Sequence, residues 1–184
     1  MHKQLLLSVA VLLGLISSFS AEGREFKAKV VGITDGDTIK VLKDGTEYKI
    51  RLRGIDCPEK SQPFGKQAKL FTSGLAFNKD VSVVENGQDR YGRLIADIIL
   101  PDHTSLSKDI IRAGYAWWYR QYAPKDRNLA YAETDAKLDG IGIWSAQYTQ
   151  APWDYRHNQH EDNKLRAHNY FNKISQSTSV RLTQ

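Results

Sequence analysis

The fold is decided by residues 26–52, which read FKAKVVGITDGDTIKVLKDGTEYKIRL. Apolar and basic residues alternate through residues 26–30, as expected for a strand with one face on a core and one face in water. A second strand covers residues 39–41, and Asp44-Gly45 then forms a two-residue hairpin turn because both positions tolerate positive φ. The third strand, residues 48–52, places apolar side chains on one face and basic ones on the other. The stretch therefore predicts a three-stranded antiparallel meander.

The rest of the chain adds two strands and three helices to this meander. The strands are predicted at residues 81–85 and 94–100. Apolar residues at helical spacing predict helices over residues 65–77, 105–113 and 128–138, with glycines ending the second and third. Short strands interrupted by a helix indicate an α+β fold, a five-stranded OB-type β-barrel with three helices.

The chain divides into three parts by composition. Residues 1–21 begin with basic side chains, continue with a short apolar run and end in small residues, which is typical of a signal peptide. The alternative, a retained membrane anchor, is disfavoured because the apolar run is short. We expect a secreted or periplasmic protein with no stable membrane anchor. Residues 22–146 form the predicted domain, and residues 147–184 a polar extension that is helical around 164–174.

Charge and cysteine content narrow the functional classes. The formal net charge is +5 and the isoelectric point about 9.2, which suits an anionic partner such as nucleic acid or a membrane surface. The only cysteine is Cys57, so an internal disulfide is excluded despite the predicted export. Stability must therefore come from the core, from a metal, or from both.

Most of the informative polar residues occur in four segments. Each has a plain structural interpretation: a turn at residues 34–38, a solvated strand end at 51–59, a charged hairpin at 89–93 and an aromatic core cluster at 117–125. Interleaved cations in the last segment also suit stacking on bases and contact with phosphates. Cys57 as a nucleophile is disfavoured because no histidine lies in these segments to activate it.

Together, these residues meet the requirements of phosphodiester hydrolysis. Asp37 and Asp56 are hard oxygen ligands suited to calcium. Glu59 follows closely and can orient or deprotonate a water molecule. Arg51 and Arg93 each offer paired donors to phosphoryl oxygens, whose charge grows in the transition state.

Four motifs occur in the order found in the staphylococcal nuclease family, which this chain resembles from about Phe26 to Ser145. They are Asp35-Gly36-Asp37-Thr38, Arg51, Asp56-Cys57-Pro58-Glu59 and Tyr91-Gly92-Arg93. The resemblance implies that Asp37, Asp56 and the backbone carbonyl of Cys57 bind Ca²⁺. It also implies that Arg51 and Arg93 hold the phosphoryl group, with Glu59 as the general base. Two departures are Cys57, where the family archetype has Thr, and a shorter loop at residues 60–63.

The resemblance also implies substrates, products and further contacts. Tyr91 would line a nucleotide pocket, with Tyr119 or Tyr122 stacking on bases. The enzyme would be a calcium-dependent nuclease of DNA and RNA that leaves 3′-phosphate ends, and we separately expect a monomer. Two alternatives remain open: a nucleic-acid-binding OB module without catalysis, and a domain that chiefly anchors its C-terminal extension to a partner.

Overall fold

The computed structural model describes residues 24–181, with side chains described as far as residue 170. The predicted signal peptide, residues 1–21, lies outside the described residues. Four α-helices and a short 3₁₀ helix accompany the strands in this part of the chain. Three of the helices were predicted in the domain, and the fourth includes the helical stretch predicted around residues 164–174 of the polar extension.

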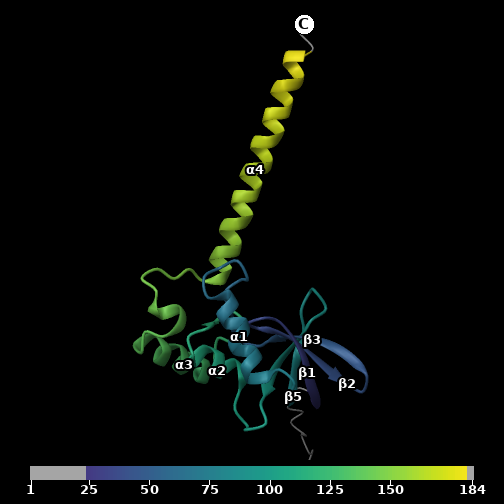
Figure 1. Ribbon diagram of the computed structural model, residues 1–184, viewed down its shortest axis with the longest axis vertical. Helices are drawn as coiled ribbons and strands as arrows, with labels where there is room; N and C mark the ends of the chain where they lie inside the picture. The colour runs from purple at the N-terminus through teal and green to yellow at the C-terminus, as the bar shows by residue number, and fades with distance from the viewer. Residues whose placement is uncertain (1–23, 182–184) are drawn as a thin grey trace, which may run out of the picture.

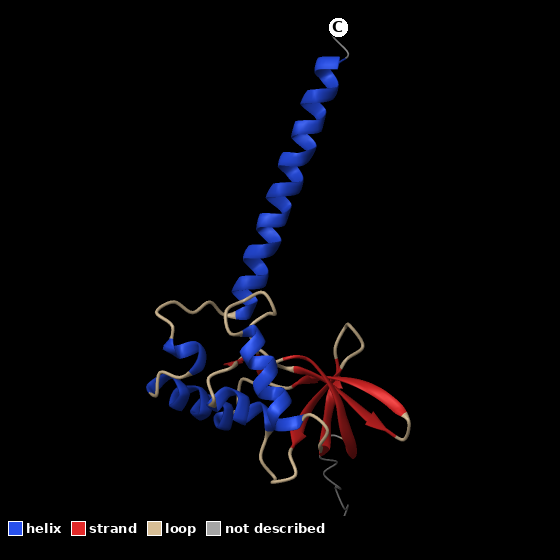
Figure 2. Ribbon diagram, in the orientation of Figure 1, coloured by secondary structure: helices blue, strands red, loops and turns tan. Residues whose placement is uncertain are grey.

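Five strands close into a barrel in the order β1-β2-β3-β6-β5, which confirms the predicted fold class (Figure 2). They are β1 (Glu25–Asp35), β2 (Thr38–Lys43), β3 (Thr46–Leu52), β5 (Asp80–Gln88) and β6 (Leu94–Ile99). All neighbouring pairs are antiparallel except β3 with β6, which is parallel. The parallel pair is reached through a long connection that contains the first helix, as parallel pairing requires.

The barrel interior follows from the alternation in the strands. Val30, Val41, Ile50, Val83 and Ile98 are each fully buried. The β2–β3 turn has the predicted geometry, with φ of 48° at the first turn residue and 77° at the second. Positive φ at both positions matches the twist of the flanking strands and fixes their register, so the polar side chain of Arg51 faces away from the core.

Three short helices pack beside the barrel (Figure 2). They are α1 (Gly65–Ala76), α2 (Leu106–Arg112) and α3 (Arg127–Leu138). Side chains cap two of them: Ser105 accepts a hydrogen bond from Lys108 N, and Asp126 accepts one from Leu129 N. The 3₁₀ helix η1 (Gly142–Ser145) follows α3.

A small second sheet, which the sequence did not predict, joins β4 (Ile55–Asp56) to β7 (Trp117–Trp118). Each of its strands has two residues, too few for a recognisable alternation. The pairing matters for the site because Asp56 lies directly opposite Trp117, which ties the end of the barrel to the segment before α3.

Helix α4 (Pro152–Arg181) has 30 residues and projects away from the barrel, with its base near the loop that precedes α1 (Figure 1). It begins well before the predicted helical stretch at residues 164–174. Proline suits the first helical position, where its missing N–H costs nothing. The polar sequence gives no apolar stripe, so periodicity could not reveal the full length. Between residues 24 and 181, no helix is both long and apolar enough to cross a membrane.

Candidate active site

A cleft of about 770 Å³ lies where the β1–β2 connection, the end of β3, the β5–β6 hairpin and the base of α4 come together. All nine residues singled out in the sequence line this cleft. They are Asp37, Arg51, Asp56, Cys57, Glu59, Tyr91, Arg93, Tyr119 and Tyr122. Their roles remain predictions, but their convergence brings together segments that are widely separated in sequence.

Arg51 and two buried carboxylates form the centre of the cleft. Arg51 Nη2 lies 2.9 Å from Asp56 Oδ1 and 3.2 Å from Asp37 Oδ2. The same guanidinium donates through Nη1 to the carbonyl oxygens of Leu52 and Ile55, at 3.0 and 2.9 Å. These backbone bonds hold the arginine at the strand end, so its position does not depend on the carboxylates alone.

Burial and neighbouring charges shift the pKa values of the ionisable side chains at the centre of the cleft. The pKa of Asp35 is raised to about 6, first by burial and then by the charge of Asp37. Burial also raises the pKa of Asp56, although hydrogen bonds from Arg156 oppose the rise. For Arg51, burial works against the charged form, but Asp37 and Asp56 outweigh it and raise the pKa. The centre is therefore rich in negative charge and keeps its arginine protonated.

Gly36 and Cys57 bring the two aspartates together. A Cβ added at Gly36 would lie 2.7 Å from Cys57 Sγ and 2.9 Å from the Cβ of Ala68, so only glycine fits there. This close approach lets Cys57 N donate to Asp37 Oδ2 at 2.7 Å. Burial raises the pKa of the Cys57 thiol well above its usual value, which argues against a nucleophilic role.

Arg93 lies at the edge of this centre and is held by Asp89. Arg93 Nε donates to Asp89 Oδ2 at 2.7 Å, and Nη1 lies 3.4 Å from Oγ1 of Thr38. Burial alone would raise the pKa of Asp89, but hydrogen bonds from the Arg93 backbone and side chain lower it below its usual value. The hairpin loop therefore positions one guanidinium beside Thr38, in the lining of the cleft.

In the described part of the chain, Arg51 pairs with the two aspartates, whereas the Glu59 side chain pairs with a different arginine. Its carboxylate accepts a hydrogen bond at 2.8 Å from Nη1 of Arg156, a residue of helix α4. A Cβ added at Gly65 would lie 2.0 Å from the carbonyl oxygen of Glu59, so glycine at the start of α1 allows the Glu59 backbone its position. Arg156 also donates from Nη2 to Asp56 Oδ2 at 2.8 Å.

Trp153 and Arg156 also line the cleft, and neither was predicted from the sequence as a site residue. Trp153 stacks on Tyr119, with ring centroids 5.2 Å apart and planes 11° apart. The signal available in the sequence was Pro152 as a helix start, after which Trp153 and Arg156 fall three residues apart on one helical face. Nothing in the sequence indicated that this face turns toward the barrel.

The three tyrosines lie at the rim. Tyr91 and Tyr122 are exposed, and Tyr91 lies beside the guanidinium groups of Arg90 and Arg93. Tyr119 is half-buried between Trp153 and Tyr122, whose ring meets it edge-on at 4.7 Å. Burial, followed by the charge of Asp56, raises the pKa of the Tyr119 hydroxyl, which keeps it neutral. The exposed rings of Tyr91 and Tyr122 suit stacking on bases, whereas Trp153 already stacks on the ring of Tyr119.

The donor set fits a divalent cation. In the described residues, no three Asp, Glu, His or Cys side chains gather into a metal-binding cluster. The predicted site needs only two such side chains, and Asp37 and Asp56 do converge on one guanidinium nitrogen. Hard carboxylate oxygens suit calcium or magnesium, and a cation would offset the charge of Asp37, which together with the larger effect of burial raises the pKa of Asp35.

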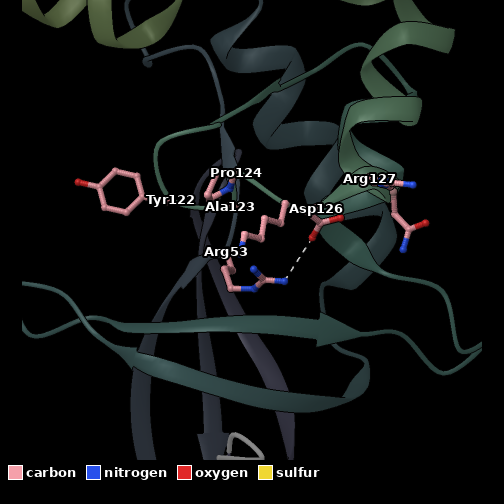
Figure 3. A pocket seen from close by; sticks show the side chains of 8 residues that line it. Arg53, Tyr122, Ala123, Pro124, Asp126 and Arg127 are labelled. Atoms are coloured by element: carbon pink, nitrogen blue, oxygen red, sulfur yellow. Dashed lines mark hydrogen bonds and ion pairs between the residues drawn. The ribbon is translucent and has the colours of Figure 1, made fainter.

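A second, more open pocket of about 580 Å³ adjoins the cleft at Arg53 and Tyr122 (Figure 3). Arg53 there pairs with Asp97 at 2.7 Å and with Asp126 at 3.3 Å. Because Asp126 caps helix α3, this arginine ties the end of β3 to α3 and β6. Its guanidinium thus has a structural task, although Arg53 also lines the cleft.

In sequence, the chain is similar to known nucleases. A family model described as staphylococcal nuclease homologue matches residues 49–146. A protein named micrococcal nuclease from Shigella flexneri is 36% identical over 158 residues, which span 81% of this chain and 90% of that protein. An uncharacterized endonuclease of Haemophilus influenzae is 35% identical over 156 residues, spanning 84% and 85% of the two chains. One from Escherichia coli O157:H7 is 35% identical over 133 residues, spanning 72% and 86%.

Proposed function

Because the chain belongs to the staphylococcal nuclease family, we propose that it is a calcium-dependent nuclease that cuts DNA and RNA and leaves 3′-phosphate ends. Its nuclease relatives support nucleic-acid hydrolysis and suggest a divalent metal. The observation that carries the finer proposal is the convergence of Asp37 and Asp56 on Arg51, in a cleft that Glu59 and Arg93 also line.

Asp37, Asp56 and the Cys57 carbonyl would hold the cation. When bound, calcium supplies positive charge next to a phosphoryl oxygen and lowers the cost of the charge that develops there. Extracellular calcium sites are often weak, and a weak site would suffice for a secreted enzyme. The burial of both carboxylates strengthens their interaction with a cation, because water screens it less.

The side chains would carry the remaining steps. Glu59 accepts a proton from a water molecule as the water oxygen attacks phosphorus. Arg51 and Arg93 donate hydrogen bonds to the phosphoryl oxygens as their negative charge grows. The bond from phosphorus to the 5′ oxygen breaks, which leaves a 3′-phosphate on one fragment and, after protonation, a 5′-hydroxyl on the other. Since water is the attacking group, the 2′-hydroxyl is not required, and both DNA and RNA are substrates.

The aromatic rim would hold the nucleotides that flank the scissile bond. Tyr91 is exposed beside Arg90 and Arg93, which places a stacking surface next to cationic donors. Tyr122, packed edge-on against Tyr119, offers a second exposed ring in the lining of the cleft. Stacking accepts any base, so we expect weak sequence preference.

The proposal also includes export from the cell, for which the support is the sequence pattern of residues 1–21. We propose that these residues direct secretion to the periplasm or the medium and are then removed. Amino-terminal sequencing of the protein recovered from cell fractions tests this, and an intact amino terminus in the cytoplasm would contradict it.

The decisive experiment digests end-labelled DNA and RNA with calcium, with magnesium and with excess chelator. We expect cleavage of both polymers with calcium, none with chelator, and 3′-phosphate ends identified by their resistance to polymerase extension until phosphatase is added. Full activity in chelator would contradict the metal requirement. Salt-dependent binding without cleavage over hours would instead favour a binding module.

A variant series tests the residue assignments. Glu59→Gln and Arg93→Ala should each lower kcat by roughly two to four orders of magnitude, the range typical of a lost general base or charge-stabilising donor. Circular dichroism should show an unchanged fold, because both side chains are partly exposed. Wild-type rates in both variants would overturn the assignments.

A further inference from the structure

The base of helix α4 extends into the cleft and contacts two of its acidic residues. Arg156 Nη1 lies 2.8 Å from Glu59 Oε1, and Nη2 lies 2.8 Å from Asp56 Oδ2. One guanidinium thus bridges the predicted base and a predicted cation ligand. The link joins residues about one hundred positions apart, and neither the family resemblance nor the sequence pattern assigned it a role.

Residues 150–156, here called the arm, are held against the domain by three contacts that precede Arg156 in the chain. Gln62 Nε2 donates to the carbonyl oxygen of Gln150 at 2.6 Å, and Tyr155 Oη donates to Ser61 Oγ at 3.0 Å. Trp153 stacks on Tyr119. Since the side chain of Gln62 is itself buried, this anchor is not a loose surface contact. The arm therefore fixes the point from which Arg156 reaches into the cleft.

Glu59 depends on this contact for its orientation. Within the part of the chain that the structure describes, Arg156 is the side chain that donates to the Glu59 carboxylate, which is 39% exposed. A partly exposed glutamate without a partner samples several rotamers, and only a fraction of them aim at one point. The planar fork of arginine removes this freedom because its two nitrogens fix Glu59 relative to Asp56.

We propose that Arg156 is a positioning residue, which holds Glu59 at the place where the attacking water loses its proton. The proposal rests on the proposed function, in which Glu59 is the general base. A reacting group held in place raises the rate of the chemical step far more than it raises substrate affinity. Arg156 thus acts on kcat through Glu59, and the arm belongs to the active site although it lies outside the barrel.

The kinetic test compares Arg156→Met, Arg156→Lys and a matched control, Arg166→Met, which removes an exposed arginine further along α4. We expect Arg156→Met to lower kcat about ten- to a hundredfold and to change KM by less than about threefold. The loss in kcat should be smaller than that caused by removing the general base itself, because Glu59 is still present. Lysine restores the charge but not the fork, so it should recover only part of the loss. Arg166→Met should match the wild type.

A double-mutant cycle shows whether Arg156 works through Glu59. If it does, adding Arg156→Met to Glu59→Gln should change kcat by less than about threefold, because residues that act as a unit are not additive. A merely structural arm would instead lower kcat by the same factor in both backgrounds, which would overturn the proposal.

Calcium titration by calorimetry, without nucleic acid, gives a readout that does not depend on turnover. Removing the Arg156 charge beside Asp56 should leave calcium affinity equal or tighten it severalfold, since a cation no longer competes with a guanidinium for that carboxylate. Weaker calcium binding by Arg156→Met would mean that the arm supports the whole site and would overturn the positioning role.

The remaining outcomes are also decisive. Unchanged kcat in Arg156→Met rules out the proposal, and raised kcat would show that Arg156 obstructs the cleft instead of organising it. A wild-type protein that cuts neither DNA nor RNA with calcium removes the proposed function itself. If the wild type cleaves normally but the Arg156 variants give one of the contradicting results above, the positioning role is wrong while the proposed function stands.

Discussion

Gly36 shows how one residue without a side chain positions two carboxylates. Replacing it with alanine places a methyl group 2.7 Å from Cys57 Sγ and 2.9 Å from Ala68 Cβ, both parts of the packed core. We expect Gly36→Ala to lower the free energy of unfolding by about 1–3 kcal/mol, as overpacking does. Chemical denaturation followed by tryptophan fluorescence measures the change.

Gly74→Ala is the matched control. Gly74 lies inside helix α1, and an added Cβ there meets nothing within 4 Å. Alanine should therefore stabilise the protein by about 0.5–1 kcal/mol, because glycine loses more backbone entropy in a helix. If both variants shift stability in the same direction, the contact of Gly36 with Cys57 is not the cause.

The sequence revealed nine cleft residues but missed Trp153 and Arg156, and the reason is local. Asp37, Arg51 and Glu59 lie at strand ends and turns, where polar residues break a clear apolar alternation and attract attention. Arg156 lies in a polar stretch that has no such background. Its partners, Asp56 and Glu59, are about one hundred residues away, and only the folded chain brings them together.

Glu133 connects helix α3 to strand β7. This residue of α3 is buried, and its carboxylate accepts hydrogen bonds from Trp118 N at 3.0 Å, Arg120 Nη2 at 3.0 Å and Lys137 Nζ at 2.8 Å. The bond to Trp118 anchors β7, whose neighbour β4 carries Asp56.

We expect Glu133→Gln to reduce the free energy of unfolding by about 1–3 kcal/mol, since it loses two charge-assisted bonds to partly exposed cations. Asp135→Asn, on the exposed face of the same helix, should change it by less than about 0.5 kcal/mol. Thermal or urea unfolding of both variants provides the comparison. Equal effects would show that the two charged contacts of Glu133 contribute little to stability.

Helix α4 begins in the arm, which contacts the domain, and continues into an exposed segment. Residues 157–170 are all exposed, whereas the arm is docked on the cleft. A chain that ends at Arg166 should keep nuclease activity within about twofold of wild type, and a chain that ends at Gln147 should lose about tenfold or more because Arg156 is gone. Cleavage rates of both truncated proteins, with circular dichroism as the folding control, test this division. Equal rates would mean that catalysis does not need the arm.

The strength of each local pattern decided which elements the sequence could predict. β1, β2 and β3 are six residues long or more, and the alternation within residues 26–30, 39–41 and 48–52 was enough to recognise them. The two-residue strands β4 and β7 are too short for any pattern, and their pairing depends on tertiary contacts. The parallel pairing of β3 with β6 likewise follows from barrel closure, which no single segment encodes.

For the whole molecule, a bound cation should stabilise the fold. A ligand that binds only the native state adds about 2.7 kcal/mol at a concentration one hundred times its Kd. We therefore expect calcium to raise Tm by several degrees in differential scanning calorimetry. Asp37→Asn and Asp56→Asn should each remove most of this shift. An equal calcium effect in both variants would locate the ion elsewhere.

The length of helix α4 has a practical consequence. At 1.5 Å per residue, its 30 residues form a rod about 45 Å long, which leaves the barrel on one side only (Figure 1). A fluorophore, affinity tag or bead coupled at the far tip would be separated from long polymeric substrates by several nanometres. Because of this separation, the enzyme could be immobilised through the tip of α4 on a solid support without blocking the cleft.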